Sequence, residues 1–300
     1  MPRPALSSRS RARATSGARG ATSGVPGALR TLGVRPSRRL GQNFLSDPRV
    51  AQRIVDLVSD PMEPVVEIGP GLGALTTLLA RTGRPLVAVE VDFRLAEAQE
   101  NILREWPAAG VVRGDILEQR LDTLIPGSAP VTIVGNLPYS ITTPAIEWIL
   151  AQGSRVRRAV LMVQREYAER LAAAPGGKEF GSLSVYVSLH AEVETLFRAS
   201  PGAFYPRPDV DSVVLEMRPR PWPGSTEEER ALVERLARAG MGTRRKTIAN
   251  SLARGMDVES GRVRSLLERA AIEAERRAET VSVEEWIRLA RVWSAEESRS

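Results

Sequence analysis

Short apolar runs alternate with helix-like segments between residues 65 and 163, and this alternation limits the possible folds more than any other feature of the sequence. The runs 65–68, 86–90, 111–112, 131–135 and 159–163 are expected to be strands, and the segments 72–80, 94–104 and 144–151 to be helices. Strands that alternate with helices form a parallel sheet, because each return to the sheet needs a crossover. The sequence therefore predicts a doubly wound, Rossmann-like α/β fold.

Two further extended stretches, 184–196 and 212–218, have little helical sequence between them. We expect them to pair antiparallel at one edge of the sheet, with the proline-containing loop 200–211 between them. Beyond residue 220 the composition shifts to helix formers. We therefore expect an α/β domain at 38–220 and a small all-helical domain at 221–300.

The net charge of +6 is concentrated at the N-terminus. Residues 1–40 hold nine arginines and no acid, whereas the rest of the chain carries 33 basic and 36 acidic residues. Residues 1–37 lack sustained apolar periodicity, so we expect a disordered, Arg-rich tail. Such a segment is also typical of an organellar transit peptide, the alternative being a bacterial extension that attracts nucleic acid or has no role.

Composition excludes several classes of chemistry. The chain has no cysteine and a single histidine, His190, which rules out disulfides, thiolate zinc sites, iron–sulfur clusters and multi-histidine metal centres. No apolar run approaches the roughly 18 residues of a membrane span, and a secretory signal is not recognisable. We expect a cytoplasmic protein without a metal, and a structural role for His190 within an extended stretch.

A glycine-rich motif at residues 67–73 follows the first strand and opens a helix. Glycines allow a tight turn and close approach of a ligand, and the helix N-terminus presents unpaired N–H groups. A nucleotide-type cofactor would fit there. The spacing Gly69-x-Gly71-x-x-Ala74 also satisfies the dinucleotide fingerprint of NAD-dependent dehydrogenases, which remains an alternative at this point.

Two carboxylates follow at successive strand ends. Glu90 ends the second strand, about 20 residues after the glycines, where it could accept hydrogen bonds from both ribose hydroxyls. Asp115 follows the third strand and could hold an adenine amino group. Consecutive strand ends at the carboxyl edge are where doubly wound sheets bind ligands, so the two acids support a nucleotide-type site.

The segment Gly135-Asn136-Leu137-Pro138-Tyr139 ends the fourth strand. The exocyclic amine of a base is a poor nucleophile because its lone pair is delocalised into the ring. Acceptors aimed at the amino protons localise that pair, and the Asn136 side-chain oxygen with the carbonyl of Leu137 or Pro138 can supply two. Tyr139 then offers a ring for stacking of the flipped base, a contact worth roughly 1–3 kcal/mol. The motif indicates methylation of a base amine.

With these motifs in order, the chain resembles the ribosomal RNA adenine N6,N6-dimethyltransferase family, and most closely its small-subunit branch. The resemblance extends from about residue 38 to 293 and rests on residues 40–45, 67–73, 89–92, 114–115, 135–144, 180–184, 204–212 and 244–247. Two features depart from the pattern. The Arg-rich tail lies outside the common core, and Tyr205 stands where Thr or His would be expected.

The resemblance implies S-adenosylmethionine as cofactor and dimethylation of N6 at two adjacent adenosines in the 3′-terminal hairpin loop of small-subunit rRNA. The substrate would be a pre-assembled small subunit, and the enzyme a monomer. The implied donor contacts are Asn43, Leu45, Gly69, Gly71, Glu90, Asp115 and Asn136. The implied groups around the target base are Asn136, Leu137, Pro138 and Tyr139, with Phe204 and Phe44 as aromatic walls.

A basic stripe between residues 235 and 254 contains Arg244, Arg245 and Lys246 and no acid. A charge run can be a solvated helix face, but the resemblance favours contacts with RNA phosphates, which position RNA without reading its sequence. Two alternatives to the small-subunit function remain. One is a large-subunit rRNA methyltransferase that confers antibiotic resistance, and the other is a non-catalytic nucleic-acid-binding factor of the same fold.

Overall fold

A seven-stranded mixed sheet forms the centre of the computed structural model, which describes residues 24–298 except Arg38, Ser59, Pro223, Ser225 and Arg244. The strand order is β4-β3-β2-β5-β6-β9-β7, with β2 to β6 parallel and β9 antiparallel to both of its neighbours. The strands are β2 (Val65–Ile68), β3 (Leu86–Glu90), β4 (Ala109–Arg113), β5 (Val131–Asn136), β6 (Val156–Gln164), β7 (Ala191–Ala199) and β9 (Ser212–Pro219). This confirms the expected Rossmann-like α/β fold.

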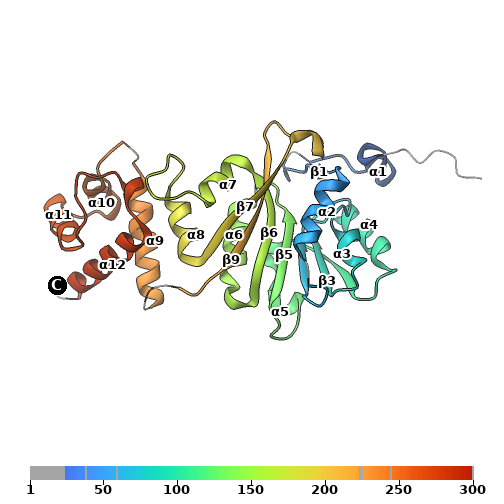
Figure 1. The fold of residues 1–300 in the computed structure, drawn as a ribbon, viewed down its shortest axis with the longest axis horizontal. Helices are drawn as coiled ribbons and strands as arrows, with labels where there is room; N and C mark the ends of the chain where they lie inside the picture. The colour runs from blue at the N-terminus through green and yellow to red at the C-terminus, as the bar shows by residue number, and fades with distance from the viewer. Residues whose placement is uncertain are drawn as a thin grey trace, which may run out of the picture.

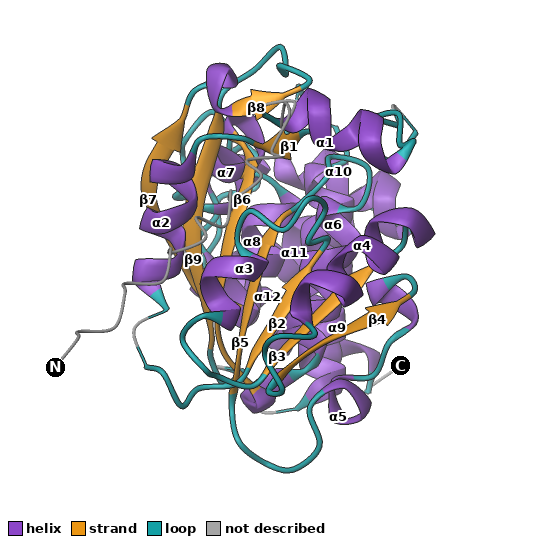
Figure 2. Ribbon diagram, turned by 90° about the vertical axis from the view of Figure 1, so that its right-hand side faces the viewer, coloured by secondary structure: helices purple, strands orange, loops and turns teal. Residues whose placement is uncertain are grey.

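Helices cover both faces of the sheet (Figure 2). One face packs against α2 (Pro48–Leu57), α3 (Thr76–Ala80) and α4 (Phe93–Leu103), and the other against α5 (Leu121–Leu124), α6 (Thr142–Ala151) and α7 (Arg165–Leu171). Successive residues of a strand point to opposite faces. Accordingly, Val134 lies in the core beside α2 and α3, whereas Ile133 lies in the core beside α6.

The stretch expected as a single extended run over 184–196 is instead a helix followed by a strand, and that expectation is wrong for its first half. Helix α8 (Ser182–His190) precedes β7, so His190 ends a helix. The Ser184 hydroxyl accepts a hydrogen bond from the Gly181 N–H at the helix start (3.0 Å). Val185 and Leu189, four residues apart, bury one helix face against the C-terminal helices. The expected antiparallel pairing at the sheet edge is confirmed for β7 and β9.

Helix α1 (Val25–Leu32) occupies part of the segment expected to be disordered, so that expectation is wrong for this stretch. The helix ends at Gly33, whose φ of 62° gives a left-handed C-cap. Leu29 and Val34 are buried against Phe44 and Leu95. A helix this short shows no sustained periodicity in the sequence, and its burial depends on distant residues. Residues 1–23 lie outside the described part of the chain.

The C-terminal region is helical, as expected (Figure 1). Its helices are α9 (Glu227–Met241), α10 (Ile248–Met256), α11 (Ser260–Arg269) and α12 (Val283–Glu297). They surround the buried indoles of Trp286 and Trp293, and Phe180, Val185 and Leu189 join the same core. A domain boundary near residue 220 therefore stays a proposal, because this core crosses it. Among the described residues, no helix is long and apolar enough to span a membrane.

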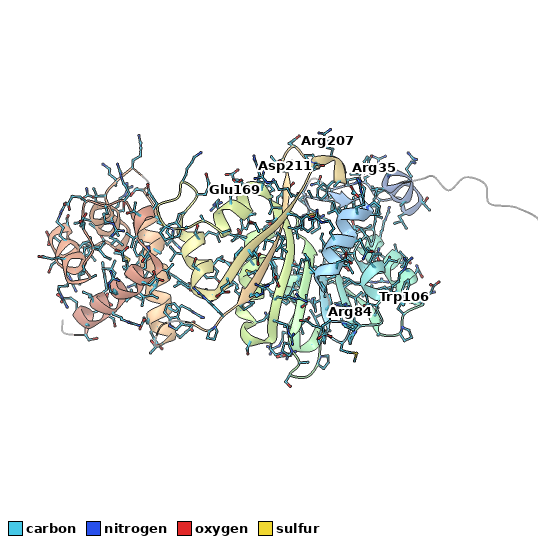
Figure 3. The ribbon with its side chains drawn as sticks, in the orientation of Figure 1. Arg35, Arg84, Trp106, Glu169, Arg207 and Asp211 are labelled. Atoms are coloured by element: carbon cyan, nitrogen blue, oxygen red, sulfur yellow. The ribbon has the colours of Figure 1, made fainter. Side chains whose placement is uncertain are left out.

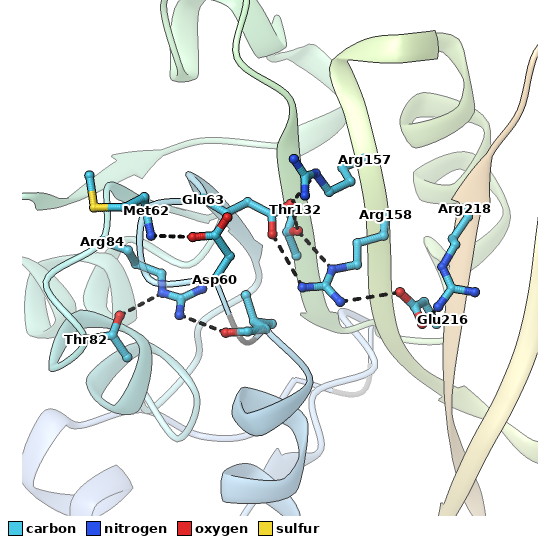
Figure 4. Close-up of polar contacts among 11 residues, drawn as sticks. Asp60, Met62, Glu63, Thr82, Arg84, Thr132, Arg157, Arg158, Glu216 and Arg218 are labelled. Carbon is cyan, nitrogen blue, oxygen red and sulfur yellow. Dashed lines mark hydrogen bonds and ion pairs between the residues drawn. The ribbon is translucent and has the colours of Figure 1, made fainter.

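A polar network lies near the amino ends of the parallel strands, opposite the carboxyl ends that form the pocket described below (Figure 4). The buried Glu63 carboxylate accepts from the Thr132 hydroxyl (2.6 Å) and pairs with the Arg158 guanidinium (3.4 Å). Arg158 also lies 3.6 Å from Glu216. Removing one member of a buried ion pair is strongly destabilising. The network therefore ties the segment before β2 to β5, β6 and β9, away from the pocket described below.

Candidate active site

In the described part of the chain, the predicted donor-binding and catalytic residues line one pocket, which lies at the carboxyl ends of the parallel strands. Its empty volume, open mouth included, is about 1250 Å³. The predicted residues on its wall are Asn43, Leu45, Gly69, Gly71, Glu90, Asp115, Asn136, Leu137, Pro138, Tyr139 and Phe204, with Phe44 beside them.

The glycine turn between β2 and α3 has the geometry of a ligand cradle. Gly69, Gly71 and Gly73 have φ values of 67°, 56° and 83°, which L side chains rarely adopt. A Cβ at Gly69 would meet nothing within 4 Å, so the space above it is open to a ligand. A Cβ at Gly71 would lie 3.1 Å from the Phe44 ring. These features fit a nucleotide-type cofactor that approaches the backbone closely.

Glu90 lies at the carboxyl end of β3 and is nearly buried. Its two oxygens accept from the Gly71 N–H (3.0 Å) and the Asp92 N–H (2.9 Å), so the carboxylate holds the glycine turn in place. Burial raises its pKa, against the opposing effect of these backbone donors. Each carboxylate oxygen has a second lone-pair site, and these can accept from the hydroxyls of a ribose.

Asp115 follows β4 and lies on the same pocket wall. One of its oxygens caps a short helical turn by accepting from the Leu117 N–H (3.0 Å). This bond fixes the rotamer of the side chain and leaves acceptor capacity on the carboxylate. Glu90 and Asp115 thus present acceptors at two adjacent strand ends, as their places in the sequence predict.

Asn136 ends β5, and the direction of its carboxamide is fixed. Its Nδ2 donates to the backbone carbonyl of Asn43 (2.9 Å). The donor end of the amide is therefore engaged, and Oδ1 remains the acceptor. The segment that carries Asn43 is itself held by β1 (Phe44–Leu45), which pairs antiparallel with β8 (Phe204–Tyr205). This arrangement suits a side chain that must accept a hydrogen bond from a substrate amine.

The next two carbonyls differ in their availability. The Pro138 carbonyl accepts from the Ile141 N–H (3.1 Å) and the Thr142 hydroxyl (3.0 Å), so both of its lone pairs are occupied. No hydrogen bond among the described residues ends on the Leu137 carbonyl. Of the two backbone acceptors that the sequence left open, the geometry favours Leu137.

The aromatic residues surround the pocket from different sides. Tyr139 is about a third exposed (37%), which leaves its ring accessible for stacking, and partial burial raises the pKa of its hydroxyl. In the β1–β8 pair, Phe44 lies opposite Tyr205 and Leu45 opposite Phe204. Because adjacent residues of a strand point to opposite faces, Phe44 and Phe204 approach the pocket from opposite faces of this ribbon. Phe44 contacts the glycine turn, and the role of Phe44 and Phe204 as walls for the base stays a prediction.

The predicted RNA-binding residues do not line this pocket. Arg245 and Lys246 lie in the turn before α10, in the helical region, and Arg244 lies outside the described residues. Other exposed basic residues lie nearer the pocket: Arg35 precedes β1, and Arg207 follows β8 (Figure 3). The stripe and the pocket are therefore separate features of the surface.

Two buried polar residues near the glycine turn received no role in the sequence analysis. Gln99 of α4 is fully buried, and its Nε2 donates to the Gly71 carbonyl (3.0 Å). The sequence feature that could have identified Gln99 is its position, as a polar residue, on the apolar helix face formed by Leu95 and Leu103. Glu67 lies beneath the glycine turn, and burial raises its pKa to about 8, with the neighbouring Glu90 adding to the effect. The sequence feature that could have identified Glu67 is its position, as an acidic residue, inside the short apolar run 65–68.

Comparison with known proteins adds three findings. Residues 34–294 match the model of the family described as ribosomal RNA adenine dimethylase. The ribosomal RNA small subunit methyltransferase A of Desulforapulum autotrophicum is 43% identical over 264 residues, which cover 86% of this chain and 92% of that protein. Its namesake from Geobacter metallireducens is 39% identical over 271 residues, covering 89% of this chain and 98% of that protein.

Solved structures show the same fold. The 23S rRNA methyltransferase ErmE is 28% identical with a TM-score of 0.65, and the match covers 84% of this chain and 100% of that one. A dimethyladenosine transferase from Plasmodium falciparum is 21% identical with a TM-score of 0.68 over 85% of this chain and 98% of that one. The second likeness concerns the fold alone.

Proposed function

The chain belongs to the ribosomal RNA adenine dimethylase family, and from this premise we propose how its site methylates RNA. It is an S-adenosylmethionine-dependent rRNA adenine dimethyltransferase that acts on small-subunit rRNA. We assign the reaction to N6 of two adjacent adenosines in the 3′-terminal hairpin loop. Relatives at about 40% identity that carry the small-subunit name favour this over the large-subunit alternative.

The observation that carries the mechanism is the fixed carboxamide of Asn136. With Nδ2 bonded to Asn43, its Oδ1 and the free Leu137 carbonyl form a pair of acceptors for the two N–H groups of an adenine amine. Accepting both protons localises the lone pair of N6. Tyr139 and Phe204 restrict the base to an orientation in which that lone pair faces the donor side of the pocket. A dehydrogenase would leave this pair of acceptors without a role.

The donor side is formed by the glycine turn and the strand-end acids. S-adenosylmethionine supplies, when bound, an electrophilic methyl group. Gly69 and Gly71 allow its close approach, Glu90 accepts from the ribose hydroxyls and Asp115 accepts from the adenine amino group. Asn43 and Leu45 close the pocket from the β1 side. The chain contributes orientation and acceptors more than acid–base catalysis.

The remaining partners follow from this function. Arg245 and Lys246, with Arg244 beside them in the sequence, would contact phosphates of the pre-assembled small subunit. We place the enzyme in the cytoplasm as a monomer that needs no metal. The organellar alternative depends on the Arg-rich tail, residues 1–37, of which residues 1–23 lie outside the described part of the chain.

The substrate is tested by incubating the protein with labelled S-adenosylmethionine and separated immature small and large ribosomal subunits. Label should enter the RNA of the small subunit only. Label confined to large-subunit RNA would overturn the branch assignment. No label in either RNA, from a protein that still binds subunits, would favour the non-catalytic binding factor.

A further inference from the structure

Helix α1 lies before the residues that match the family model, yet it contacts the wall of the donor pocket. It lies at the end of the molecule away from the C-terminal helices, beside α4 (Figure 1). Its buried side chain Leu29 and the following Val34 pack with Leu95 of α4 and Phe44 of β1. An element outside the common family core is therefore built into the surroundings of the site.

The end of α1 is held by polar contacts as well as by apolar packing. The N–H groups of Gly33 and Val34 donate back to the carbonyls of Arg30 and Leu29, which closes the helix in a left-handed cap. The Arg94 guanidinium donates to the Gly33 carbonyl. These contacts fix the point at which the chain leaves α1 and turns toward β1.

Phe44 connects this cluster to the glycine turn. Its ring lies 3.1 Å from the position of a Cβ at Gly71, so it rests directly on the backbone that cradles the donor. The preceding residue, Asn43, accepts the hydrogen bond that orients Asn136. The segment from the end of α1 into β1 thus reaches both the glycine turn and the Asn136 side chain.

We propose that α1 is a positioning element for the methyl donor: Leu29, Val34 and Leu95 hold the Phe44 ring against Gly71, which keeps the glycine turn in its binding conformation. The inference rests on the proposed function, since it takes S-adenosylmethionine as the ligand. Without α1, Phe44 samples other rotamers, and a smaller fraction of molecules is competent to bind. The apparent dissociation constant rises in inverse proportion to that fraction.

The test measures S-adenosylhomocysteine binding by calorimetry on the full-length protein, alongside denaturant unfolding. Leu29→Ala should weaken binding by roughly three- to thirtyfold, the range of couplings carried by packed side chains. The volume-conserving Leu29→Met should restore it. Leu266→Ala is the matched control, because Leu266 is equally buried in α11 of the helical region and should lower stability without changing affinity.

The route through Phe44 is tested by a double-mutant cycle. In a Phe44→Ala background, Leu29→Ala should change the affinity no further, because the side chain through which it acts is gone. Should Leu29→Ala fail to fold, Arg94→Met, which removes only the contact with the Gly33 carbonyl, takes its place in the cycle.

The outcomes separate the inference from the function on which it rests. Three results would each overturn the positioning role of α1. They are wild-type affinity in Leu29→Ala, additive effects of Leu29→Ala and Phe44→Ala on affinity, and equal weakening of binding by Leu266→Ala. A wild-type protein that fails to bind S-adenosylhomocysteine would instead contradict the donor site itself.

Discussion

In the proposed mechanism, the Asn136 side chain must meet two requirements. Its amide N–H group needs a hydrogen-bond acceptor within the protein, and its Oδ1 must remain free for the substrate. The Asn43 carbonyl meets the first requirement at 2.9 Å. An acceptor held in place before the substrate arrives needs no reorganisation during the reaction, and a preorganised group of this kind typically contributes about 10²–10³ in kcat. The proposed acceptor role of Asn136 therefore depends on a backbone carbonyl that is far away in the sequence.

Replacing this residue tests that assignment. Asn136→Ala should reduce single-turnover methylation of small subunits by about 10²–10³ or more, while RNA affinity in a filter-binding assay stays near that of the wild type. Methylation at a near-normal rate in this variant would remove the acceptor role from Asn136. Tyr139→Phe is a useful companion, because it keeps the stacking ring and should retain most of the activity.

The burial of Glu67 predicts that folding stability depends on pH. Burial raises its pKa from 4.5 to about 8, so the folded state holds the proton more tightly than the unfolded chain does. Folding stability attributable to this group is therefore greatest below pH 4.5 and falls as the pH rises toward 8. Glu67→Gln should flatten the dependence of the unfolding free energy on pH in this window and be the more stable protein at pH 8. Parallel curves for the two proteins, from urea unfolding at several pH values, would contradict the assignment.

Spacing along the chain was sufficient to predict that the candidate site residues would gather at one edge of the sheet. Glu90 and Asn136 end strands of one parallel sheet, and Asp115 follows another of its strands. The carboxyl ends of such strands meet at one edge. Gln99 and the Asn43 carbonyl could not be placed in this way. Their contacts depend on how α4 and β1 pack against the glycine turn, which local sequence does not specify.

At the scale of elements, the glycine turn joins β2 to α3 and lines the side of the pocket that we propose for the methyl donor. Gly71 and Gly83 both have positive φ, but a Cβ at Gly71 would meet the Phe44 ring, whereas one at Gly83 would meet nothing within 4 Å. The two positions therefore separate the cost of backbone strain from the cost of filling the cradle.

Alanine at either position should lower the unfolding free energy by about 1 kcal/mol, since a side chain is forced into the left-handed region. Only Gly71→Ala should also weaken S-adenosylhomocysteine binding, by about tenfold or more, because Phe44 must move to accommodate the methyl group. Calorimetry and denaturant unfolding measure the two effects. Equal loss of affinity in Gly83→Ala would argue against a cradle at Gly71.

Two helices show where sequence patterns are insufficient. Val185, Tyr186 and Val187 are residues that favour strands, yet they lie in α8 because Val185 and Leu189 complete the core of the C-terminal helices. Similarly, α1 is stabilised by Leu95, which lies more than sixty residues away. Tertiary burial decides both elements, whereas the parallel strands could be identified from their own sequences.

For the whole molecule, the charge distribution favours separate sites for RNA docking and for methyl transfer. The net charge of +6 comes from the first 40 residues, so the body of the protein offers RNA only local basic groups. Arg245 and Lys246 lie in the turn before α10. Helix α10 lies at the opposite end of the molecule from α4 (Figure 1). We therefore expect docking and catalysis to be affected independently by substitution.

Arg245→Ala combined with Lys246→Ala should weaken binding to small subunits and flatten the plot of log affinity against log salt by roughly one unit per lost phosphate contact. Donor affinity should stay unchanged. Arg104→Ala, an exposed basic residue at the end of α4, is the control and should leave the slope as in the wild type. An unchanged slope in the double variant would exclude these two residues from the RNA interface.

The central claim is that this site transfers methyl groups to the N6 amines of adjacent adenosines. It is tested most directly by treating small subunits that lack these methyl groups with the protein and S-adenosylmethionine, then mapping the modified nucleosides by mass spectrometry. The account predicts N6,N6-dimethyladenosine at two neighbouring positions near the 3′ end of the rRNA. Methyl groups on ribose or on another base atom, in RNA that the protein has modified, would contradict it.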